Sequence, residues 1–297
     1  MRKTLEGLFT YAEFGACLTA FLPVMAVSSM RHRGDPTQRN PGRWMRRLGR
    51  TTSRLTPLWK FTIEGEPPPD IAHHAYVVVS NHESQADPFL LSWLPFDMRW
   101  VAKEELFRPP LTGWAMRFGG DIPLRRGQGD SVRAMMMECE RALAGGISVM
   151  MFPEGTRSKD GVMLPFKDGA FALAIRAQVP VLPVAIAGTH QMRPKHSRWF
   201  GRAHACAKML APIPTSGLGE GDVGALRDRR AERHRRCAAG SPRALRHGQR
   251  VVASRCHASS LSSSSRHALP PLPVASCVSA GWPSAPGSAT NGTNANE

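Results

Sequence analysis

The chain has 297 residues and a formal net charge of +16, and 42% of its residues are hydrophobic. This length and composition are typical of a globular protein with one large or two small domains, and they exclude a chain that is disordered throughout. Half of the excess charge lies in residues 227–297, which hold eleven arginines and three acidic residues. The six cysteines are widely spaced and form no pattern, so we expect reduced thiols in a cytosolic compartment.

An uncharged stretch near the start, residues 14–30, predicts a membrane-associated helix. At 1.5 Å per residue this helix would be about 25 Å long, which is less than the hydrocarbon core of a bilayer. Glu13 is expected to limit its extension, and Pro23 to kink its middle. A tilted span, a re-entrant anchor and a buried core helix all fit this pattern. A signal peptide is disfavoured because a strongly basic segment follows the apolar run.

Residues 31–54 form this basic flank, with eight arginines against one acidic residue, Asp35. Positive charge marks the cytoplasmic side of a membrane segment, and each such residue near anionic lipid adds about 1 kcal/mol of binding free energy. The same run would suit nucleic acid, but the neighbouring apolar segment favours lipid. We therefore assign residues 1–54 to an N-terminal hydrophobic anchor with a basic flank. We place the protein at the cell membrane, with the following domain on the cytoplasmic face, and expect no nucleic-acid partner.

Strands and helices alternate in the middle of the chain, residues 55–230. The predicted strands, most of them continuous apolar runs, are residues 77–79, 99–102, 147–152, 181–187 and 203–210. The clearest predicted helices are residues 131–144 and 166–177. This alternation predicts an α/β fold with a central, mostly parallel sheet flanked by helices, preceded by the N-terminal membrane-associated helical segment. Ligands of such sheets bind beyond the strand ends.

The character of the chain changes at residue 231. Residues 231–297 are rich in Arg, Ser and Pro and lack an apolar period, so we expect them to be disordered. Residues 226–230 resemble the start of a charged helix that is then abandoned. This break raises the hypothesis of a frame-shifted or otherwise aberrant terminus. A basic tail that binds lipid or nucleic acid is the functional alternative.

An imidazole and a carboxylate follow the strand predicted at residues 77–79. The chain turns into His82, and Asp87 lies five residues further on. A helical turn that begins near Glu83 would bring Asp87 back beside His82, because five residues are just over one turn. A carboxylate that holds one ring nitrogen of a histidine leaves the other free to take a proton from an alcohol. His82 and Asp87 are therefore a candidate catalytic pair.

A polar loop follows the strand predicted at residues 147–152. Arg157 supplies a guanidinium, Glu154 a carboxylate that could orient it, Gly155 a flexible backbone and Thr156 a hydroxyl. Guanidinium groups bind phosphate oxygens in a bidentate way, and backbone N–H groups beside a glycine can approach a phosphate closely. Turns favour the same residue types, so the loop gains its weight from occurring together with the histidine and aspartate.

These residues belong to four blocks that follow one another along the chain. The blocks are residues 81–87, 120–126, 152–158 and 179–184, with the sequences NHESQAD, GDIPLRR, FPEGTRS and VPVLPV. In order and content they resemble the blocks of the glycerolipid acyltransferases typified by 1-acyl-glycerol-3-phosphate acyltransferase. The first and third blocks are highly specific, and Arg126 falls at the family's arginine position in the second. The resemblance covers roughly residues 40–215 and makes residues 55–230 the expected catalytic domain.

The resemblance implies transfer of a fatty acyl group from a thioester of coenzyme A or acyl carrier protein to the free hydroxyl of lysophosphatidic acid, which makes phosphatidic acid in phospholipid biosynthesis. His82 would be the general base for the attacking hydroxyl, and Asp87 would orient the imidazole. No Ser or Cys nucleophile is required, so no acyl-enzyme is expected. The groups that would hold the acceptor's phosphate are Arg126, Glu154, Gly155, Thr156 and Arg157. Lys103 is a further candidate cation for the phosphate, or a solvated lysine beside two glutamates.

Several alternatives stay open at this point. The acceptor could be another lysophospholipid or a lyso-ornithine lipid, since the same blocks would serve them. From a different class, a non-catalytic basic membrane-binding protein on this scaffold would lack the base or the phosphate arginine, and neither is missing here. We expect no cofactor and no metal, because the His and Cys residues are scattered without ligand spacing. The expected partners are a phospholipid membrane, a lysophospholipid acceptor and acyl-CoA or acyl carrier protein as co-substrate.

Overall fold

A seven-stranded sheet organises the protein in the computed structural model, which describes the backbone of residues 2–240 and the side chains of residues 4–231. The strands are β1 (Trp59–Glu64), β2 (Val77–Ser80), β3 (Met98–Lys103), β4 (Ile122–Leu124), β5 (Ser148–Met151), β6 (Val181–Ala187) and β7 (Ala203–Met209). Their spatial order is β1-β7-β6-β2-β5-β3-β4, and each neighbouring pair is parallel except β6 and β7. The predicted α/β fold with a mostly parallel sheet is confirmed.

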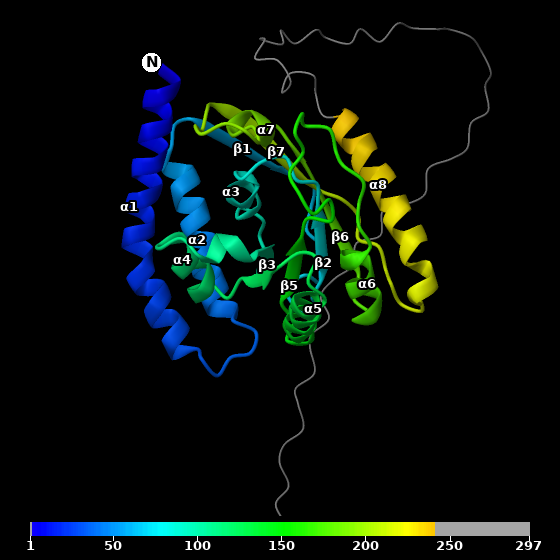
Figure 1. Cartoon of the computed structure of the whole chain (residues 1–297). Coiled ribbons are helices and arrows are strands. Elements are labelled where there is room, and N and C mark those ends of the chain that lie inside the picture. The colour runs from blue at the N-terminus through cyan, green and yellow to red at the C-terminus, as the bar shows by residue number, and fades with distance from the viewer. Residues whose placement is uncertain (1, 241–297) are drawn as a thin grey trace, which may run out of the picture. The chain divides into compact units, whose positions relative to one another are not determined.

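Helices flank this sheet (Figure 1). They are α1 (Arg2–Arg31), α2 (Arg39–Leu55), α3 (Asp87–Leu91), α4 (Thr112–Phe118), α5 (Gly129–Ala144), α6 (Gly169–Arg176), α7 (Thr189–Met192) and α8 (Val223–Gly240), with 3-10 turns at Glu104–Phe107 and Glu220–Asp222. Because successive strand side chains point to opposite faces, β2 serves two cores. Val77 and Val79 join the cluster with α5 and α6, and Val78 joins the cluster with α3.

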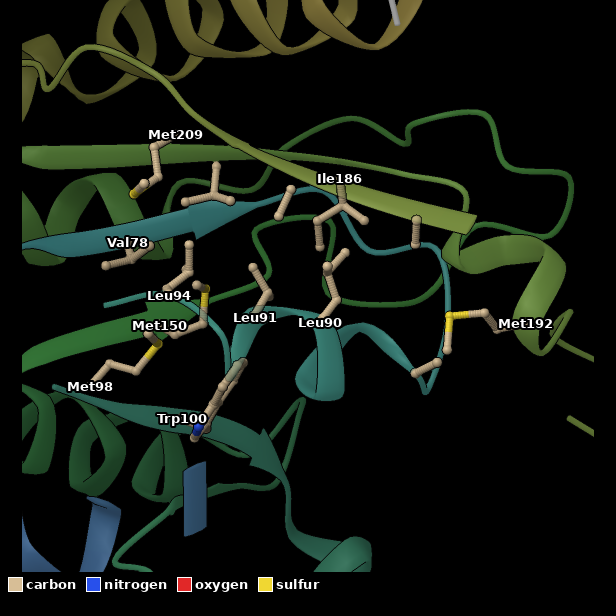
Figure 2. Packing of buried hydrophobic residues seen from close by; sticks show 14 of the residues in the cluster. Val78, Leu90, Leu91, Leu94, Met98, Trp100, Met150, Ile186, Met192 and Met209 are labelled. Atoms are coloured by element: carbon tan, nitrogen blue, oxygen red, sulfur yellow. The ribbon is translucent and has the colours of Figure 1, made fainter. Parts of the chain in front are cut away.

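The core on the α3 side of the sheet fixes the helix that follows the catalytic histidine candidate (Figure 2). Leu90 and Leu91 of α3 are fully buried against β-strand side chains that include Val78 and Ile186. Burial of each leucine contributes about 1.5–3 kcal/mol. These contacts hold α3, and with it Asp87 at its first residue, against the sheet.

Helix α1 is longer than the uncharged stretch predicted. It continues past Glu13 and contains Pro23, so the expected limit at Glu13 was wrong. The uncharged stretch marks where the chain is most apolar, and helix-compatible residues on its N-terminal side extend the helix to about 45 Å. Among the described residues, Thr4–Arg31 is the one helix that is long and apolar enough to cross a membrane, by length and composition only.

One side of α1 packs on the rest of the protein, and the other is exposed. Cys17, Leu18 and Met25 form a cluster with Leu48 of α2 and Ala115 of α4. The exposed apolar side chains of α1 are Leu5, Leu8, Phe9, Tyr11, Val24, Val27 and Met30. The buried-helix interpretation therefore describes one side of this helix, and the membrane-anchor interpretation stays a prediction for its exposed apolar side.

The structure adds contacts to the basic flank and moves the C-terminal boundary. Much of the flank is helix α2, and three of its arginines form ion pairs with Asp97, while its orientation toward lipid stays a prediction. The boundary predicted at residue 230 falls within α8, which continues to Gly240 because residues 231–239 contain no helix breaker. The expectation of disorder was therefore wrong for residues 231–240. The rest of the predicted tail, residues 241–297, lies outside the described part.

Candidate active site

Two loops meet at one edge of the sheet. His82 follows β2, and the loop that contains Glu154 and Arg157 follows β5. Strands β2 and β5 are parallel neighbours, so their carboxyl ends lie side by side. The backbone joins the two loops directly, since the N–H of Ser158 donates a hydrogen bond of 2.9 Å to the carbonyl of His82.

The imidazole of His82 is held by Asp87. The distance from Nδ1 to Oδ2 of Asp87 is 2.7 Å, and the aspartate side chain is fully buried. The other ring nitrogen, Nε2, has no hydrogen-bond partner among the described residues, and the His82 side chain keeps 18% of its exposure. The ring also stacks on Phe152 with centroids 4.1 Å apart. The imidazole is thus fixed in orientation, with one nitrogen accessible.

The path of the chain between these two residues differs from the prediction. No helical turn begins near Glu83; instead α3 begins at Asp87 itself. The carboxylate of Asp87 turns back and accepts the backbone N–H groups of Glu83 at 2.9 Å and Ser84 at 3.1 Å. Asp87 therefore shapes the loop and positions His82 with the same two oxygens.

Glu154 supports the histidine loop and does not bind the neighbouring arginine. Its Oε1 accepts the backbone N–H of His82 at 2.7 Å, and its Oε2 accepts that of Leu164 at 2.7 Å. The prediction that it orients Arg157 is therefore replaced by a backbone clamp between two loops. Burial, with a smaller contribution from the charge of Asp87, raises the pKa of Glu154 to about 7.

Cations gather around the loop after β5. Arg157 is half-buried, and burial together with the nearby charge of Arg193 lowers its pKa, while Asp87 opposes this effect. Lys195 donates to the carbonyl of Arg157 at 3.2 Å and lies 3.4 Å from the Thr156 hydroxyl. Such a group of positive charges beside an accessible imidazole suits a negatively charged substrate.

A fourth cation approaches the same loop at its glycine. A Cβ atom added to Gly155 would lie 3.2 Å from the Cε and Nζ atoms of Lys167. Gly155 also has a φ of 70°, a backbone conformation that disfavours other residues. No sequence pattern assigned Lys167, Arg193 or Lys195 to this site, because none of them lies in a polar loop directly after a strand.

A third buried carboxylate, which the sequence analysis did not assign to the site, also supports the histidine loop. Oε2 of Glu83 accepts the Thr189 hydroxyl at 3.2 Å and the His190 backbone N–H at 3.1 Å. Burial first, and then the charge of Asp87, raise the pKa of Glu83 to about 7. The amide of Asn81 similarly bonds both backbone groups of Ile186 in β6. These contacts tie the loop to β6 and α7.

Two predicted phosphate ligands lie apart from these contacts. Arg126 is exposed in the loop after β4, and no hydrogen bond or ion pair is recorded for it among the described residues. Lys103 ends β3 and forms an ion pair of 3.1 Å with Glu105, as its solvated interpretation expects. Both remain predictions as phosphate ligands.

The described part of the chain contains no group of side chains that is arranged to hold a metal ion. No three His, Cys, Asp or Glu side chains among those residues gather in a way that could hold a metal ion. Cys17, Cys139 and Cys206 are buried free thiols. The expectation of chemistry without metal or cofactor stays a prediction.

Known proteins are similar to the middle of this chain. The Acyltransferase family model matches residues 60–187, which include the His–Asp pair and the loop after β5. The chain is 39% identical to 1-acyl-sn-glycerol-3-phosphate acyltransferase alpha of Ovis aries over 165 residues, which cover 53% of this chain and 58% of that protein. It is 36% identical to a chloroplastic 1-acyl-sn-glycerol-3-phosphate acyltransferase of Arabidopsis thaliana, over 66% of this chain and 55% of the relative.

A solved structure agrees with these relatives. The crystal structure of the 1-acyl-sn-glycerophosphate (LPA) acyltransferase of Thermotoga maritima is similar with a TM-score of 0.64 and 26% identity, over 80% of this chain and 96% of that one. The chain is thus similar to proteins that are named as 1-acylglycerol-3-phosphate acyltransferases. It spans 58% of the length of the sheep and human relatives that it matches.

Proposed function

We propose that this protein transfers a fatty acyl group from a thioester donor to the free hydroxyl of lysophosphatidic acid, forming phosphatidic acid for phospholipid biosynthesis. The observation that carries the proposal is the 2.7 Å contact between His82 and Asp87 beside the cationic loop at residues 153–158. The printed names of the relatives, which are acyltransferases of 1-acylglycerol-3-phosphate, support the same acceptor.

In the proposed mechanism His82 acts as the general base. Its Nε2 takes the proton of the acceptor hydroxyl while the oxygen attacks the thioester carbonyl carbon. The resulting tetrahedral intermediate collapses, the carbon–sulfur bond breaks, and the leaving thiolate takes the proton back from the imidazolium. Asp87 stabilises that imidazolium through Nδ1. General base catalysis of this kind contributes about 10²–10⁴-fold to the rate.

The acceptor's phosphate is the proposed ligand of the cationic loop. Arg157 is the main candidate because its guanidinium can bind two phosphate oxygens at once. Gly155 allows the backbone to come close, and Thr156 offers a hydroxyl. Arg126 is a further proposed ligand that would have to reach the phosphate from its exposed loop. Fixing the phosphate places the hydroxyl beside His82, which removes much of the cost of bringing two molecules together.

The donor and the location complete the proposal. Coenzyme A and acyl carrier protein are both acidic carriers, so a protein with a net charge of +16 would attract either one. Helix α1 with its exposed apolar side supports membrane association. We place the catalytic domain on the cytoplasmic face because the basic flank follows α1 directly.

The direct test is identification of the product. Detergent-solubilised protein is incubated with palmitoyl-CoA and a monoacylated acceptor, and the lipids are analysed by mass spectrometry. Lysophosphatidic acid is expected to yield phosphatidic acid, and Arg157→Gln is expected to lower that yield. A diacyl product that forms only from another lysophospholipid or from a lyso-ornithine lipid would reassign the acceptor. Parallel reactions with palmitoyl-acyl carrier protein identify the donor. Absence of any diacyl product with every pair would leave the non-catalytic membrane-binding protein.

A further inference from the structure

A cavity on helix α2 gathers positive charge. It has a volume of about 380 Å³ and is lined by Arg43, Arg46, Arg47, Arg50 and Thr51. These residues recur at helical spacing, so their side chains lie on one face of α2. We call this set the arginine cavity.

The arginine cavity lies away from the candidate active site. Arg46 donates hydrogen bonds to the carbonyl of Phe96 and to Asp97, the two residues that precede β3. Strand β3 is parallel to β5, which is parallel to β2. The cavity is therefore anchored at the amino ends of these strands, whereas His82 follows the carboxyl end of β2. The two sites therefore lie at opposite ends of the strands.

Two buried donors in the cavity have no partner. The Arg46 side chain is only 4% exposed, and its Nε–H has no hydrogen-bond partner among the described residues. The buried Nε–H of Arg50 also has no hydrogen-bond partner among these residues. More than nine in ten buried polar groups in proteins are hydrogen-bonded. Both nitrogens are shielded from solvent, so an acceptor in the cavity would reach these arginines through their other guanidinium nitrogens.

The charges around the cavity point to the same conclusion. Asp97 is the one carboxylate that contacts these arginines among the described residues, and it is shared by Arg39 at 3.2 Å, Arg43 at 2.8 Å and Arg46. Arg47 stacks its guanidinium over the Trp44 ring at 4.5 Å. A single negative charge therefore faces an excess of positive ones.

The neighbouring arginines also act on the pKa of Arg46, although burial has the larger effect. Burial lowers the pKa of Arg46 to about 10, the charge of Asp97 opposes that shift, and Arg50, Arg43 and Arg47 add to it. A bound anion would offset the repulsion among these side chains. Guanidinium groups pair best with planar or tetrahedral oxyanions, which accept several N–H bonds at once.

We propose that the arginine cavity binds a phosphate group, presented by the headgroup of an anionic phospholipid or free in solution. The headgroup is the better fit, because α2 packs against α1, the helix that could enter a membrane. Occupied by a headgroup, the cavity would hold the basic flank on anionic membrane. This proposal does not depend on acyl transfer, because its residues are separate from His82 and its loop.

Arginine footprinting of the full chain tests the proposal. The detergent-solubilised protein is treated with phenylglyoxal, which modifies accessible guanidinium groups, and modified residues are located by mass spectrometry. Phosphatidylcholine vesicles are compared with vesicles that also contain phosphatidic acid, and inorganic phosphate is compared with chloride at equal ionic strength. We expect phosphatidic acid to protect Arg47 and Arg50 while the exposed Arg54 on the same helix stays reactive.

The arms distinguish the two sources of phosphate. Protection by phosphatidic acid alone identifies a lipid headgroup, and equal protection by inorganic phosphate identifies the free ion. Protection of neither Arg47 nor Arg50, or equal protection of Arg54, would overturn the proposal.

A matched pair of double variants provides an independent readout. Arg47→Gln with Arg50→Gln removes two charges from the cavity, and Arg33→Gln with Arg54→Gln removes two exposed charges outside it. We expect the cavity variant to bind vesicles that contain phosphatidic acid about 30-fold more weakly than the unaltered protein, if each contact contributes as a basic residue at an anionic surface does. The control variant is expected to lose much less. Equal losses would show general surface attraction and overturn the cavity.

Discussion

Replacing Asp87 by asparagine separates the catalytic role of this residue from its structural role. The carboxylate accepts hydrogen bonds from Nδ1 of His82 and from the backbone N–H groups of Glu83 and Ser84. An asparagine oxygen at the position of Oδ2 keeps the contacts with His82 and Glu83. In the native protein both carboxylate oxygens accept the Ser84 N–H, each at 3.1 Å. In the variant the NH₂ group replaces one of these two oxygens and cannot accept that hydrogen bond. The fold therefore loses little more than half of one hydrogen bond, or about 1 kcal/mol.

The catalytic loss is expected to be much larger. Asparagine carries no charge, so the imidazolium that forms on His82 during the reaction loses its stabilising partner. If the Asp-supported base accounts for the usual 10²–10⁴-fold, kcat should fall by at least about 10²-fold, which corresponds to roughly 2.7 kcal/mol of activation free energy. Asp87→Ala differs, because it leaves two backbone N–H groups of a buried loop unpaired at about 1–3 kcal/mol each.

The assay combines activity with stability. Thiol release from palmitoyl-CoA in the presence of lysophosphatidic acid gives kcat, and the thermal unfolding midpoint in the same detergent gives the stability. We predict that Asp87→Asn loses activity with a nearly unchanged midpoint, and that Asp87→Ala lowers both. An Asp87→Asn variant that keeps its fold and retains activity within about threefold would show that the charge of Asp87 is not needed for catalysis.

Three further predictions concern the loop after β5. The pKa of Glu154 is about 7 in the folded protein against 4.5 for a free side chain, so the folded state holds more protons between these pH values and stability falls as pH rises through them. Glu154→Gln should remove up to about 3 kcal/mol of that fall in stability. If the free energy of unfolding changed by the same amount between pH 4.5 and 7 in both proteins, this prediction would be wrong. Arg157→Gln should lower kcat/KM for lysophosphatidic acid about 10–150-fold, because a hydrogen-bonded contact to a charged group is lost. Lys159→Gln removes an exposed charge nearby and should change kcat/KM little. Equal effects of the two variants would contradict a phosphate contact of Arg157. Gly155→Ala should lower the free energy of unfolding by about 1–2 kcal/mol, because φ is 70° and the new Cβ would approach Lys167; an unchanged unfolding midpoint would contradict it.

The sequence predicted the fold best where local pattern and tertiary structure agree. Strand β6 begins and ends where its apolar run does, at Val181 and Ala187, because it is buried on both faces. The nearness of His82 and Asp87 was also predicted, although from a helical turn near Glu83 that the structure does not contain. The route between them was not, because the side chain of Asp87 competes with the backbone for the N–H groups of the loop.

Contacts between distant segments could not be predicted from the sequence. Glu83 bonds the backbone of His190, and Glu154 bonds that of Leu164, across separations that no local pattern encodes. Arg193 and Lys195 approach the candidate site from a segment without a recognisable motif. The sequence assigned the basic flank to anionic lipid, and no local pattern showed that Asp97, more than forty residues away, pairs with three of its arginines.

The proposed mechanism requires His82 to deprotonate the hydroxyl of a lysophosphatidic acid acceptor. Its most direct test is thiol release from palmitoyl-CoA by the detergent-solubilised protein, with and without lysophosphatidic acid, for the unaltered protein and for His82→Ala. We expect release that requires the acceptor and disappears in the variant, with the unfolding midpoint retained. Release without dependence on the acceptor, or release that survives in His82→Ala, would contradict it.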